Sequence, residues 1–434
     1  MSFPRYPKYK ASGVEWLGQV PEHWDVAPAK WHLRSASGGN SIKGRCANEP
    51  AEGLYPAFSA SGQDVWLENY DFNVPGIVLS AVGARCGKTF KADGAWGVVA
   101  NTHCLFPIQD SGRDYFWYLT NQGDWWEKGG SAQPFVKVSD TLARKWVFPP
   151  LTEQTAIAEF LDRETAKIDG LVAEQRRLME LLKEKRQAVI SHAVTKGLNP
   201  QAALKPSGIE WLGDVPAHWS VGKLGYASKL RGGFAFSAAD FGTEGIVVIR
   251  MNNLKRGHLD LSEAARIPEC SCNQGAALSE GDLIWGMSGS TGETGSLGNY
   301  ARVHGEDLPC QLNQRVGRFA ADSSLLNLDF LEQVIQTPYF YEQVMLLVTG
   351  TAQFNVSSEQ VQSCLVALPP VSEQVEIAAY VAREAGAFDT LTAEAQRAID
   401  LLQERRTALI SAAVTGQIDV RPRSDGINWL EPTI

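Results

Sequence analysis

Two long stretches of this sequence are copies of one another. Residues 149–195 return at residues 369–415, without a gap and 220 positions later, and about half of the paired positions are identical. Each copy starts with two prolines and an N-capping side chain, Thr152 or Ser372, and continues with one glycine and no further proline. Each copy therefore predicts one helix of about 44 residues, which would be ~65 Å long and too long for the core of a small globule.

Apolar residues follow one another in both copies in steps of four and three, a pattern typical of a coiled-coil seam. The predicted seam consists of Ile157, Leu161, Ile168, Leu171, Leu178, Leu182 and Val189 in the first copy, and of Ile377, Val381, Phe388, Leu391, Ala398, Leu402 and Leu409 in the second. We expect the helices to pack on each other in antiparallel orientation, with Glu164 near Arg405 and Lys185 near Glu384. Two unrelated helices on separate cores would leave the gapless repeat unexplained.

A shorter repeat precedes each long one. Residues 12–26 and 207–221 share the pattern Ser-Gly-x-Glu-Trp-Leu-Gly-x-Val-Pro-x-His-Trp-x-Val, here called the Trp motif, and a partial third copy stands at residues 425–430. The repeating unit is therefore Trp motif, variable region and long helix, after which the next unit begins, as in a circular arrangement. Such an order predicts that the chain ends lie near each other and that a pseudo-twofold axis relates the halves.

The two variable regions differ in most residues but keep the same landmarks. The matching landmarks are a buried strand with a glycine-rich turn (76–83 and 281–288), a helix start (114–119 and 329–334), a Gly-x-Ala-Gln segment (130–133 and 350–353) and a last strand (145–148 and 365–368). The sequence thus predicts an α+β fold. Two α/β domains, residues 1–148 and 200–368, are separated by two long helices, within residues 149–199 and 369–434, that pair as an antiparallel coiled coil. One scaffold used twice with different surfaces suggests two related recognition tasks.

The sequence contains none of the common catalytic motifs. A Walker A run and the His-Glu-x-x-His, Gly-x-Ser-x-Gly and Asn-Pro-Pro-aromatic patterns do not occur. The glycine-rich residues 288–295 are not followed by a helix pattern and predict a loop rather than a phosphate cradle. His23 and His218 stand in matching Pro-x-His-Trp sequences, far from an acidic or cysteine partner in the sequence, and predict a structural role. We expect no catalytic activity in this chain alone.

The composition of the sequence bears on the cellular compartment of the protein and on metal binding. The sequence has no apolar signal region or bilayer-spanning run, and its seven cysteines are an odd number, so it predicts a cytoplasmic protein with reduced thiols. Cys270 with Cys272, or Cys86 with His103 and Cys104, lack the two spaced ligand pairs of a zinc site. We therefore expect no metal and no cofactor in this chain.

The net charge of −9 argues against a generally basic nucleic-acid-binding protein. If DNA is bound, local clusters or partner subunits must contact the phosphates. Candidate residues on expected loops are Lys43, Arg45, Arg85 and Lys88 in the first region, and Arg231, Arg250, Asn252, Asn253, Lys255 and Arg256 in the second. Arg and Asn read guanine and adenine edges by paired hydrogen bonds, although a solvated charged loop is the simpler explanation for any one of them.

Three features together resemble the specificity subunit of type I restriction-modification enzymes: two variable regions alternating with two repeated helices, the Trp motif, and the Pro-Pro-Leu-Thr-Glu-Gln helix start at residues 149–154. The resemblance covers nearly the whole chain. It implies that each variable region is a target recognition domain reading one half of a bipartite, asymmetric DNA site, with the paired helices acting as a ruler for the spacer. A helix of ~65 Å spans about two turns of B-DNA, which fits recognition in successive major grooves.

The resemblance also implies partners. Two modification subunits, which bind S-adenosylmethionine and methylate adenine, would dock on the helices. Restriction subunits, which use ATP and Mg²⁺ to translocate and cleave DNA, would complete the endonuclease. The chain would then be a non-catalytic DNA-recognition subunit in defence against foreign DNA. The alternatives are a repeat scaffold that binds proteins rather than DNA, and a cryptic nuclease or transferase, which would act on DNA alone.

The resemblance carries over to a few site residues. The Gly-x-Ala-Gln segments at 130–133 and 350–353, followed by Phe135 and Asn355, are similar to the family's loop ahead of the last strand of each recognition domain. We expect Gln133, Lys137, Gln353 and Asn355 to contact DNA. Asn101 and Asn313 match each other at a middle landmark and are further candidates.

Overall fold

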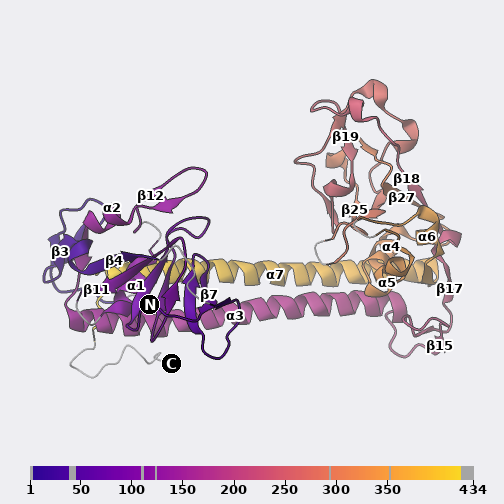
Figure 1. Ribbon diagram of the computed structural model, residues 1–434. Helices are drawn as coiled ribbons and strands as arrows, with labels where there is room; N and C mark the ends of the chain where they lie inside the picture. The colour runs from indigo at the N-terminus through magenta and orange to yellow at the C-terminus, as the bar shows by residue number, and fades with distance from the viewer. Residues whose placement is uncertain are drawn as a thin grey trace. The chain divides into compact units, whose positions relative to one another are not determined.

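The computed structural model describes residues 3–38, 45–108, 112–122, 125–292, 295–350 and 353–421. The chain forms two compact units, of which the first comprises Met1–Arg176 with Gln396–Ile434 and the second Arg177–Ala395. Each unit contains a domain of strands and short helices together with part of each of two long helices (Figure 1). The predicted mixed fold with an internal repeat is therefore confirmed.

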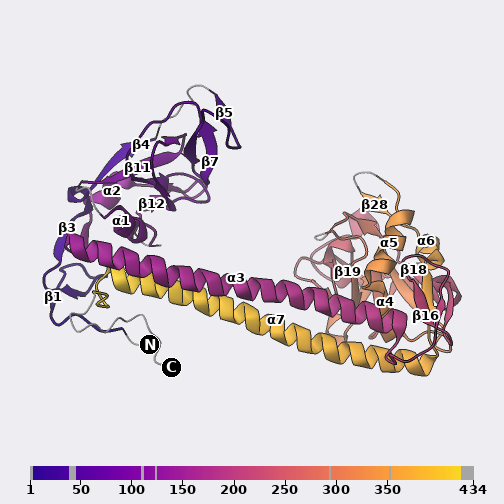
Figure 2. The same ribbon diagram turned by 90° about the horizontal axis from the view of Figure 1, so that it is seen from below.

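The two long helices are α3 (Leu151–Lys196) and α7 (Val371–Val414), of 46 and 44 residues. In the first unit the N-terminal part of α3 lies beside the C-terminal part of α7, and in the second unit the opposite ends meet (Figures 1 and 2). Within the first unit, Arg406 Nε donates to Asp169 Oδ1 at 3.0 Å. Within the second, Arg186 Nε lies 3.5 Å from Asp389 Oδ1. The helices therefore pair in antiparallel orientation, as predicted.

The seam between the helices differs in part from the predicted one. Ile157 and Leu161 on α3 and Ile377 and Val381 on α7 are fully buried, as expected. Leu171, Leu178 and Leu391, however, are 46%, 43% and 47% exposed, whereas Val172, Ala395 and Ile399 are buried. A helix with 3.6 residues per turn drifts against a strict heptad, so after Ile168 the buried face continues at Val172 instead of Leu171.

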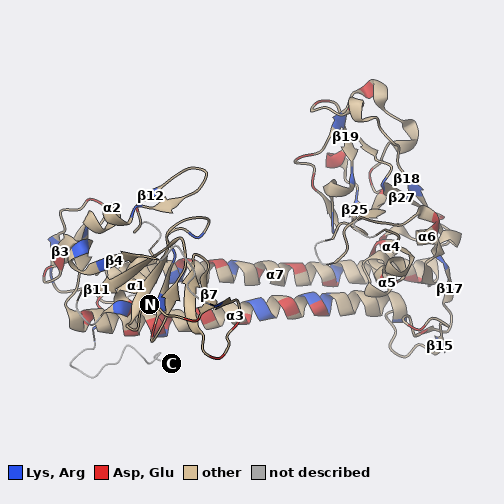
Figure 3. Cartoon of the chain, in the orientation of Figure 1, with Lys and Arg blue, Asp and Glu red and all other residues tan. Residues whose placement is uncertain are grey.

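The expected ion pairs across the seam are also corrected. Glu164 pairs with Lys167 of its own helix at 2.9 Å instead of with Arg405, and Glu384 pairs with its neighbour Arg383 at 3.3 Å. The antiparallel register places Arg406, one residue beyond Arg405, opposite a carboxylate of α3. Both signs of charge are distributed along α3 and α7 in Figure 3.

Two four-stranded sheets form the domain of the first unit. The antiparallel sheet has the order β4 (Leu33–Ser37), β11 (Thr102–Pro107), β8 (Gly76–Ser80) and β9 (Thr89–Ala92). The other has the order β10 (Gly97–Val98), β6 (Tyr55–Ser59), β7 (Gly62–Leu67) and β5 (Cys46–Ala47), with β10 parallel to β6. All residues of β8 are buried, which agrees with the strand predicted from its continuous apolar run.

The second unit repeats this strand order with different residues. Its antiparallel sheet has the order β18 (Ser228–Gly232), β27 (Val316–Ala321), β23 (Leu283–Gly286) and β25 (Tyr300–Arg302). A smaller sheet contains β22 (Arg266–Ile267), β19 (Ile246–Ile249) and β26 (Cys310–Leu312), with β26 parallel to β19 as β10 is to β6. The scaffold is therefore preserved although most of its side chains differ.

The remaining elements complete the two halves. Those of the first unit are β1 (Tyr9–Ala11), β2 (Gln19–Pro21), β3 (Asp25–Pro28), α1 (Arg113–Thr120), β12 (Lys128–Gly129), β13 (Phe135–Val136), α2 (Val138–Ala143) and β14 (Lys145–Phe148). Those of the second are β15 (Leu204–Pro206), β16 (Asp214–Pro216), β17 (Ser220–Lys223), β20 (Leu254–Lys255), β21 (His258–Leu259), β24 (Ser288–Gly289), α4 (Leu328–Ile335), α5 (Pro338–Leu347), β28 (Phe354–Asn355), α6 (Ser358–Ser363) and β29 (Leu365–Leu368). Short 3₁₀ helices lie at Ala29–Trp31, Leu224–Tyr226, Ala238–Asp240, Met251–Asn253, Glu269–Ser271, Gln274–Ala276 and Gly305–Asp307. The last strands, β14 and β29, have the predicted bounds.

A glutamate at the start of each long helix binds the Trp motif. Glu153 accepts hydrogen bonds from the indole of Trp24 at 2.9 Å and from the phenol of Tyr6 at 3.1 Å, and it lies 2.6 Å from His23 Nε2. In the second unit Glu373 repeats the arrangement with His218 at 2.8 Å and Trp219 at 3.1 Å. Both histidines therefore have the expected structural role, with a carboxylate partner that is distant in the sequence.

The two ends of the described chain meet in the first unit, as the circular repeat predicts. The phenol of Tyr9 donates to the carbonyl oxygen of Gly416 at 3.0 Å, and the amide of Asp419 donates to that of Pro4 at 2.8 Å. The partial third Trp motif at residues 425–430 lies outside the described residues. No helix in the ranges described is long and apolar enough to cross a bilayer.

Candidate nucleic-acid interface

Three loops of the first domain meet through backbone hydrogen bonds. The amide of Ala81, just after β8, donates to the carbonyl oxygen of Asn101, and the amide of Val136 in β13 donates to that of Ala81, both at 2.9 Å. The amide of Gly83 donates to the carbonyl oxygen of Pro134, also at 2.9 Å. The loop after β8, the residue before β11 and the hairpin β12–β13 therefore form one surface, here called loop surface 1.

Loop surface 1 gathers five of the residues expected from the sequence. Arg85, Lys88, Asn101, Gln133 and Lys137 all lie on these loops with exposed side chains. Asn101 adopts a left-handed backbone with φ of 67°, which Asn tolerates better than most residues. Among the described residues, no carboxylate forms an ion pair with Arg85, Lys88 or Lys137, so these cations remain available to a negatively charged ligand.

Two other first-domain candidates are placed differently. Arg85 donates to the carbonyl oxygen of Ser61 at the turn that begins β7, whereas Arg45 lies next to Glu68 at the opposite end of that strand. The structure therefore does not bring Arg45 together with loop surface 1. Lys43 lies outside the described residues.

Matching loops meet in the second domain. The amide of Met287 donates to the carbonyl oxygen of Arg315, and the amide of Val356 donates to that of Met287, both at 3.0 Å. Ser288 is the ladder partner of Asn355. The amide of Asn313 donates to the carbonyl oxygen of Ile249, which places Asn313 beside the backbone that leads to Arg250. These segments, with the exposed Gln353 that precedes β28, form loop surface 2.

Arg250 and Arg231 lie close to this surface in sequence and structure. The guanidinium of Arg250 lies 5.6 Å from the ring centre of Phe241, and its buried Nε has no hydrogen-bond partner among the described residues. Arg231 is exposed on β18, and the next residues bring Phe234 into a bridge with Asn313. The second domain therefore presents arginine and amide side chains where the first presents Arg85, Lys88 and Gln133.

The other second-domain candidates have partners within the domain. Asn253 is 2% exposed, and its amide accepts from the backbone of Arg250 and donates to the carbonyl oxygen of Asp260, both at 3.0 Å. It therefore stabilises the turn and is not free to reach a ligand. Lys255 lies 4.0 Å from the carboxylate of Asp260 and donates to the carbonyl oxygen of Asn252 at 3.2 Å. Asn252 itself is exposed.

The structure adds two candidate residues, Arg315 and Phe234, to those expected from the sequence. Arg315 is exposed and donates from Nη1 to Asn355 Oδ1 at 3.4 Å, while Asn355 Nδ2 donates to the carbonyl oxygen of Gln353 at 3.1 Å. Among the described carboxylates, none pairs with Arg315. The feature of the sequence that could have indicated Arg315 is its place two residues after Asn313, just before β27. Phe135 and Phe234 are 41% and 44% exposed, and flat aromatic side chains in these loops are suited to contact with bases.

Cys104 and Cys310 are buried inside the two domains. Burial, reinforced by Asp71, raises the pKa of Cys104 to about 12, and burial with Asp307 and Asp282 does the same for Cys310. These thiols therefore stay protonated and are poor nucleophiles. Within the ranges described, no three His, Cys, Asp or Glu residues form a group that would hold a metal ion.

A family model described as a type I restriction modification DNA specificity domain matches residues 52–177. The chain is 24% identical over 429 residues to the type I restriction enzyme MjaVIII specificity subunit of Methanocaldococcus jannaschii, covering 93% of this chain and 95% of that protein. It is 27% identical over 284 residues to the EcoKI specificity subunit of Escherichia coli, covering 64% of this chain and 58% of that one.

Two solved structures share the fold. One, described as the structural basis of complex assembly and conformational transition of the type I R-M system, gives a TM-score of 0.66 at 12% identity and covers 91% of this chain and 98% of that chain. The HsdS subunit from Thermoanaerobacter tengcongensis gives a TM-score of 0.50 at 14% identity, with coverages of 92% and 98%.

The duplicated α/β scaffold with two long paired helices is the fold of these solved structures. The family model and the relatives point to one family. Over nearly its whole length the chain is similar to a specificity subunit of a type I restriction-modification system, and residues 52–177 match the model of the DNA specificity domain.

Proposed function

We propose that loop surfaces 1 and 2 each bind one half of a bipartite DNA site and that α3 and α7 set the spacer between the halves. The observation that carries the proposal is that Gln133 and Gln353 stand at matching places of the two domains. Gln133 is followed by Phe135 in the first domain, and Gln353 is followed by Asn355 in the second. Two domains with the same backbone fold but different side chains are suited to recognising two different half-sites.

The residues proposed to contact DNA are those that the structure gathers on the two surfaces. They are Arg85, Lys88, Asn101, Gln133 and Lys137 on the first, and Arg231, Arg250, Asn313, Gln353 and Asn355 on the second. Arg45 lies at the far end of β7, and Asn252 and Lys255 lie in the segment that follows Arg250; these three are proposed only as phosphate contacts. Lys43 stays a proposal from the sequence alone, and Asn253 acts through the turn that it stabilises. The net charge of −9 means that partner subunits supply many of the phosphate contacts.

The long helices are the proposed docking surface for two modification subunits, which bind S-adenosylmethionine and methylate adenine. The leucines that leave the seam support this assignment, because Leu171, Leu178, Leu391 and Leu401 are 43% to 65% exposed. Exposed leucines on paired helices favour contact with another protein. Restriction subunits that use ATP and Mg²⁺ would join the same assembly in the cytoplasm.

Mapping of methyladenine across a genome tests the proposal. Cells would co-express the chain with the modification subunit encoded next to it, and cells without the chain are the control. The expected result is one methylated motif of two short defined blocks around a fixed gap. Exchange of residues 26–148 for those of another family member should change one block and leave the other unchanged.

The mapping also discriminates the alternative. If the modification subunit is folded and active but no two-block motif is methylated, a scaffold that binds proteins is the better explanation. Turnover of a DNA substrate by the purified chain alone would instead indicate a cryptic nuclease or transferase.

A further inference from the structure

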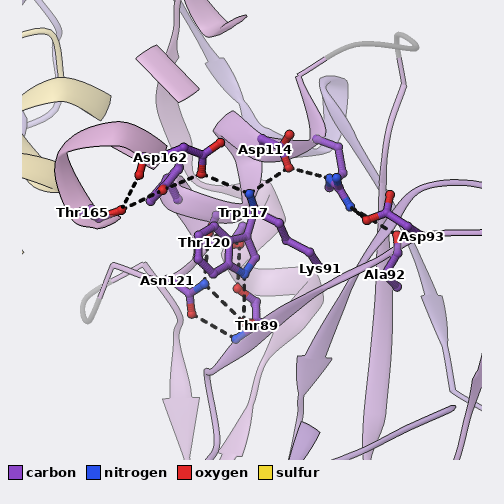
Figure 4. A network of polar contacts seen from close by, with 12 residues as sticks. Thr89, Lys91, Ala92, Asp93, Asp114, Trp117, Thr120, Asn121, Asp162 and Thr165 are labelled. Carbon is purple, nitrogen blue, oxygen red and sulfur yellow. Dashed lines mark hydrogen bonds and ion pairs between the residues drawn. The ribbon is translucent and has the colours of Figure 1, made fainter. Parts of the chain in front are cut away.

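A polar cluster joins the first domain to the first long helix (Figure 4). Lys91 Nζ of β9 lies 3.1 Å from Asp114 Oδ1 of α1 and 3.3 Å from Asp162 Oδ1 of α3. The same ammonium group lies 4.6 Å from the ring centre of Trp117. One side chain of the sheet thus contacts both the domain's own helix and α3, and the cluster is named here the Lys91 hub.

Hydrogen bonds from α1 reinforce the hub on α3. The phenol of Tyr118 donates to Asp162 Oδ1 at 2.7 Å, and it lies 3.2 Å from the hydroxyl of Thr165, which is 4% exposed. Burial raises the pKa of Tyr118 above its ordinary value, so the phenol keeps its proton and remains a donor. Asp162 therefore receives a cation from the sheet and a hydrogen bond from α1, which restricts rotation of the domain about the helix.

The second domain lacks this link at the equivalent place. In β25, the strand that matches β9, the cation is Arg302, but its Nη2 contacts Asp329 at 2.8 Å and Glu332 at 2.7 Å, both on α4. The positions of α7 that lie 220 residues after Asp162 and Thr165 are Ala382 and Ala385, which offer no polar atom in their side chains. Among the described residues, Arg302 has no ion pair with α7.

Apolar packing and hydrogen bonds hold the second domain: Gln374 of α7 accepts from the amide of Asn327 at 2.8 Å, and Gln187 of α3 donates to the carbonyl oxygen of Gln336 at 3.2 Å. Its core includes Ile190 and Val194 of α3 and Ile377 and Val381 of α7 together with residues of α4, α5 and α6. Apolar contacts are not directional, whereas hydrogen bonds and ion pairs to fixed atoms select one orientation. Among the described residues, an ion pair between a cation of the sheet and a long helix is therefore found in the first domain and not at the matching place of the second.

We propose that Lys91, Tyr118 and Asp162 are positioning residues that fix the first recognition domain on α3 and so determine how strictly the spacer of the DNA site is measured from the first half-site. This inference rests on the proposed function. It assigns spacer stringency to a contact that touches no DNA.

The test is the spacer distribution of methylated sites in cells expressing Asp162→Ala, a change that gives α3 the residue found at the matching position of α7. With wild-type protein a single spacer length is expected. With Asp162→Ala, methylation at sites whose spacer differs by one base pair should rise roughly fivefold, as expected for loss of a partly exposed polar contact, while the defined bases stay the same. Asp162→Glu, which retains the carboxylate, should restore part of the stringency.

A matched control and a second variant make the outcome decisive. Asp93 pairs with Arg113 at 2.9 Å in the same network and, among the described residues, forms no ion pair with α3, so Asp93→Asn should leave the spacer distribution as in wild type. Tyr118→Phe removes only one donor to Asp162 and should broaden the spacer in the same direction. Unchanged spacers in both Asp162→Ala and Tyr118→Phe would overturn the inference. Absence of a two-block motif in wild type would instead overturn the proposed function.

Discussion

Arg406 Nε lies 3.0 Å from Asp169 Oδ1, and a copy of this pair, Arg186 with Asp389, recurs with each residue shifted by 220 positions. Each pair joins α3 to α7 within one of the compact units. The antiparallel register is therefore marked twice by the same two residue types. The contact is thus the same in both copies of the repeat, although about half of the paired positions differ.

The first prediction concerns this pair. Asp169 and Arg406 are 58% and 33% exposed, so screening by water keeps their coupling small, at ~0.5 kcal/mol. A double-mutant cycle with Asp169→Asn and Arg406→Gln, followed by the free energy of unfolding in denaturant, measures the coupling. Arg405→Gln is the matched control because Arg405 is exposed and has no carboxylate partner among the described residues. A cycle with Asp169 and Arg405 that gives an equal coupling would contradict the observed register.

A second prediction addresses the anchor of the Trp motif. Glu153→Gln removes the charge that accepts bonds from His23, Trp24 and Tyr6 in a site where Glu153 is 7% exposed. The free energy of unfolding should fall by about 1–3 kcal/mol, because buried donors lose a charged acceptor. Glu159→Gln, an exposed position of the same helix, should change it by less than about 0.5 kcal/mol. Equal effects of the two changes would show that the anchor does not stabilise the fold.

A third prediction separates the two half-sites. Arg315 is held by Asn355 on loop surface 2, so Arg315→Ala should weaken discrimination at one base pair of a single half-site by about 1–3 kcal/mol. Arg85→Ala on loop surface 1 should affect only the other half-site. Mapping of methyladenine with each variant shows which block loses its defined base. If both variants relax the same block, the assignment of one surface to each half-site is wrong.

A fourth prediction follows from the buried thiols. The folded-state pKa of Cys104 and Cys310 is raised to about 12, above the value of a free thiol, so the unfolded chain loses these protons first as the pH rises. The stability linked to the protonated thiols is fully present below the unfolded pKa and is lost as the pH rises to about 12. A thiol reagent at neutral pH should label the exposed Cys46, Cys270 and Cys272 quickly, and Cys104 and Cys310 only after unfolding. Fast labelling of Cys104 in the folded protein would disprove its burial.

Much of the fold could be predicted because its signals are local or repeated. Periodicity predicted both long helices, and matched landmarks predicted strands β14 and β29. The helices begin at Leu151 and Val371, so Thr152 and Ser372 lie in the first turn and are not the N-cap residues expected from the sequence. The predicted seam is wrong beyond Ile168. Leu171 and Val172 lie three and four positions further on and are both apolar, so the sequence alone does not show which of them is buried. The Lys91 hub could not be predicted, since its charged groups come from β9, α1 and α3 and are adjacent only after folding.

The candidate site was predicted in outline only. The Gly-x-Ala-Gln segments gave Gln133 and Gln353, because these stand at the same place in a repeat. Arg315 was not predicted, because its place in the candidate site depends on a hydrogen bond to Asn355, which lies in a strand that is distant in the sequence. Asn253 was included because its residue type suits base recognition, but its amide is used within its own turn. Residue type alone does not distinguish a side chain that faces a ligand from one that holds a loop.

The division of the long helices between the units bears on how the chain folds as it is made. The second unit is continuous in sequence, from Arg177 to Ala395, so all of its contacts are available before synthesis ends. The first unit needs Gln396 and the residues after it, and the bond from Tyr9 to Gly416 spans 407 positions. Contacts between distant parts of a chain form late, because a long loop must close first. The domain synthesised first is therefore the last to be completed, and until then the N-terminal part of α3 has an apolar face without its partner.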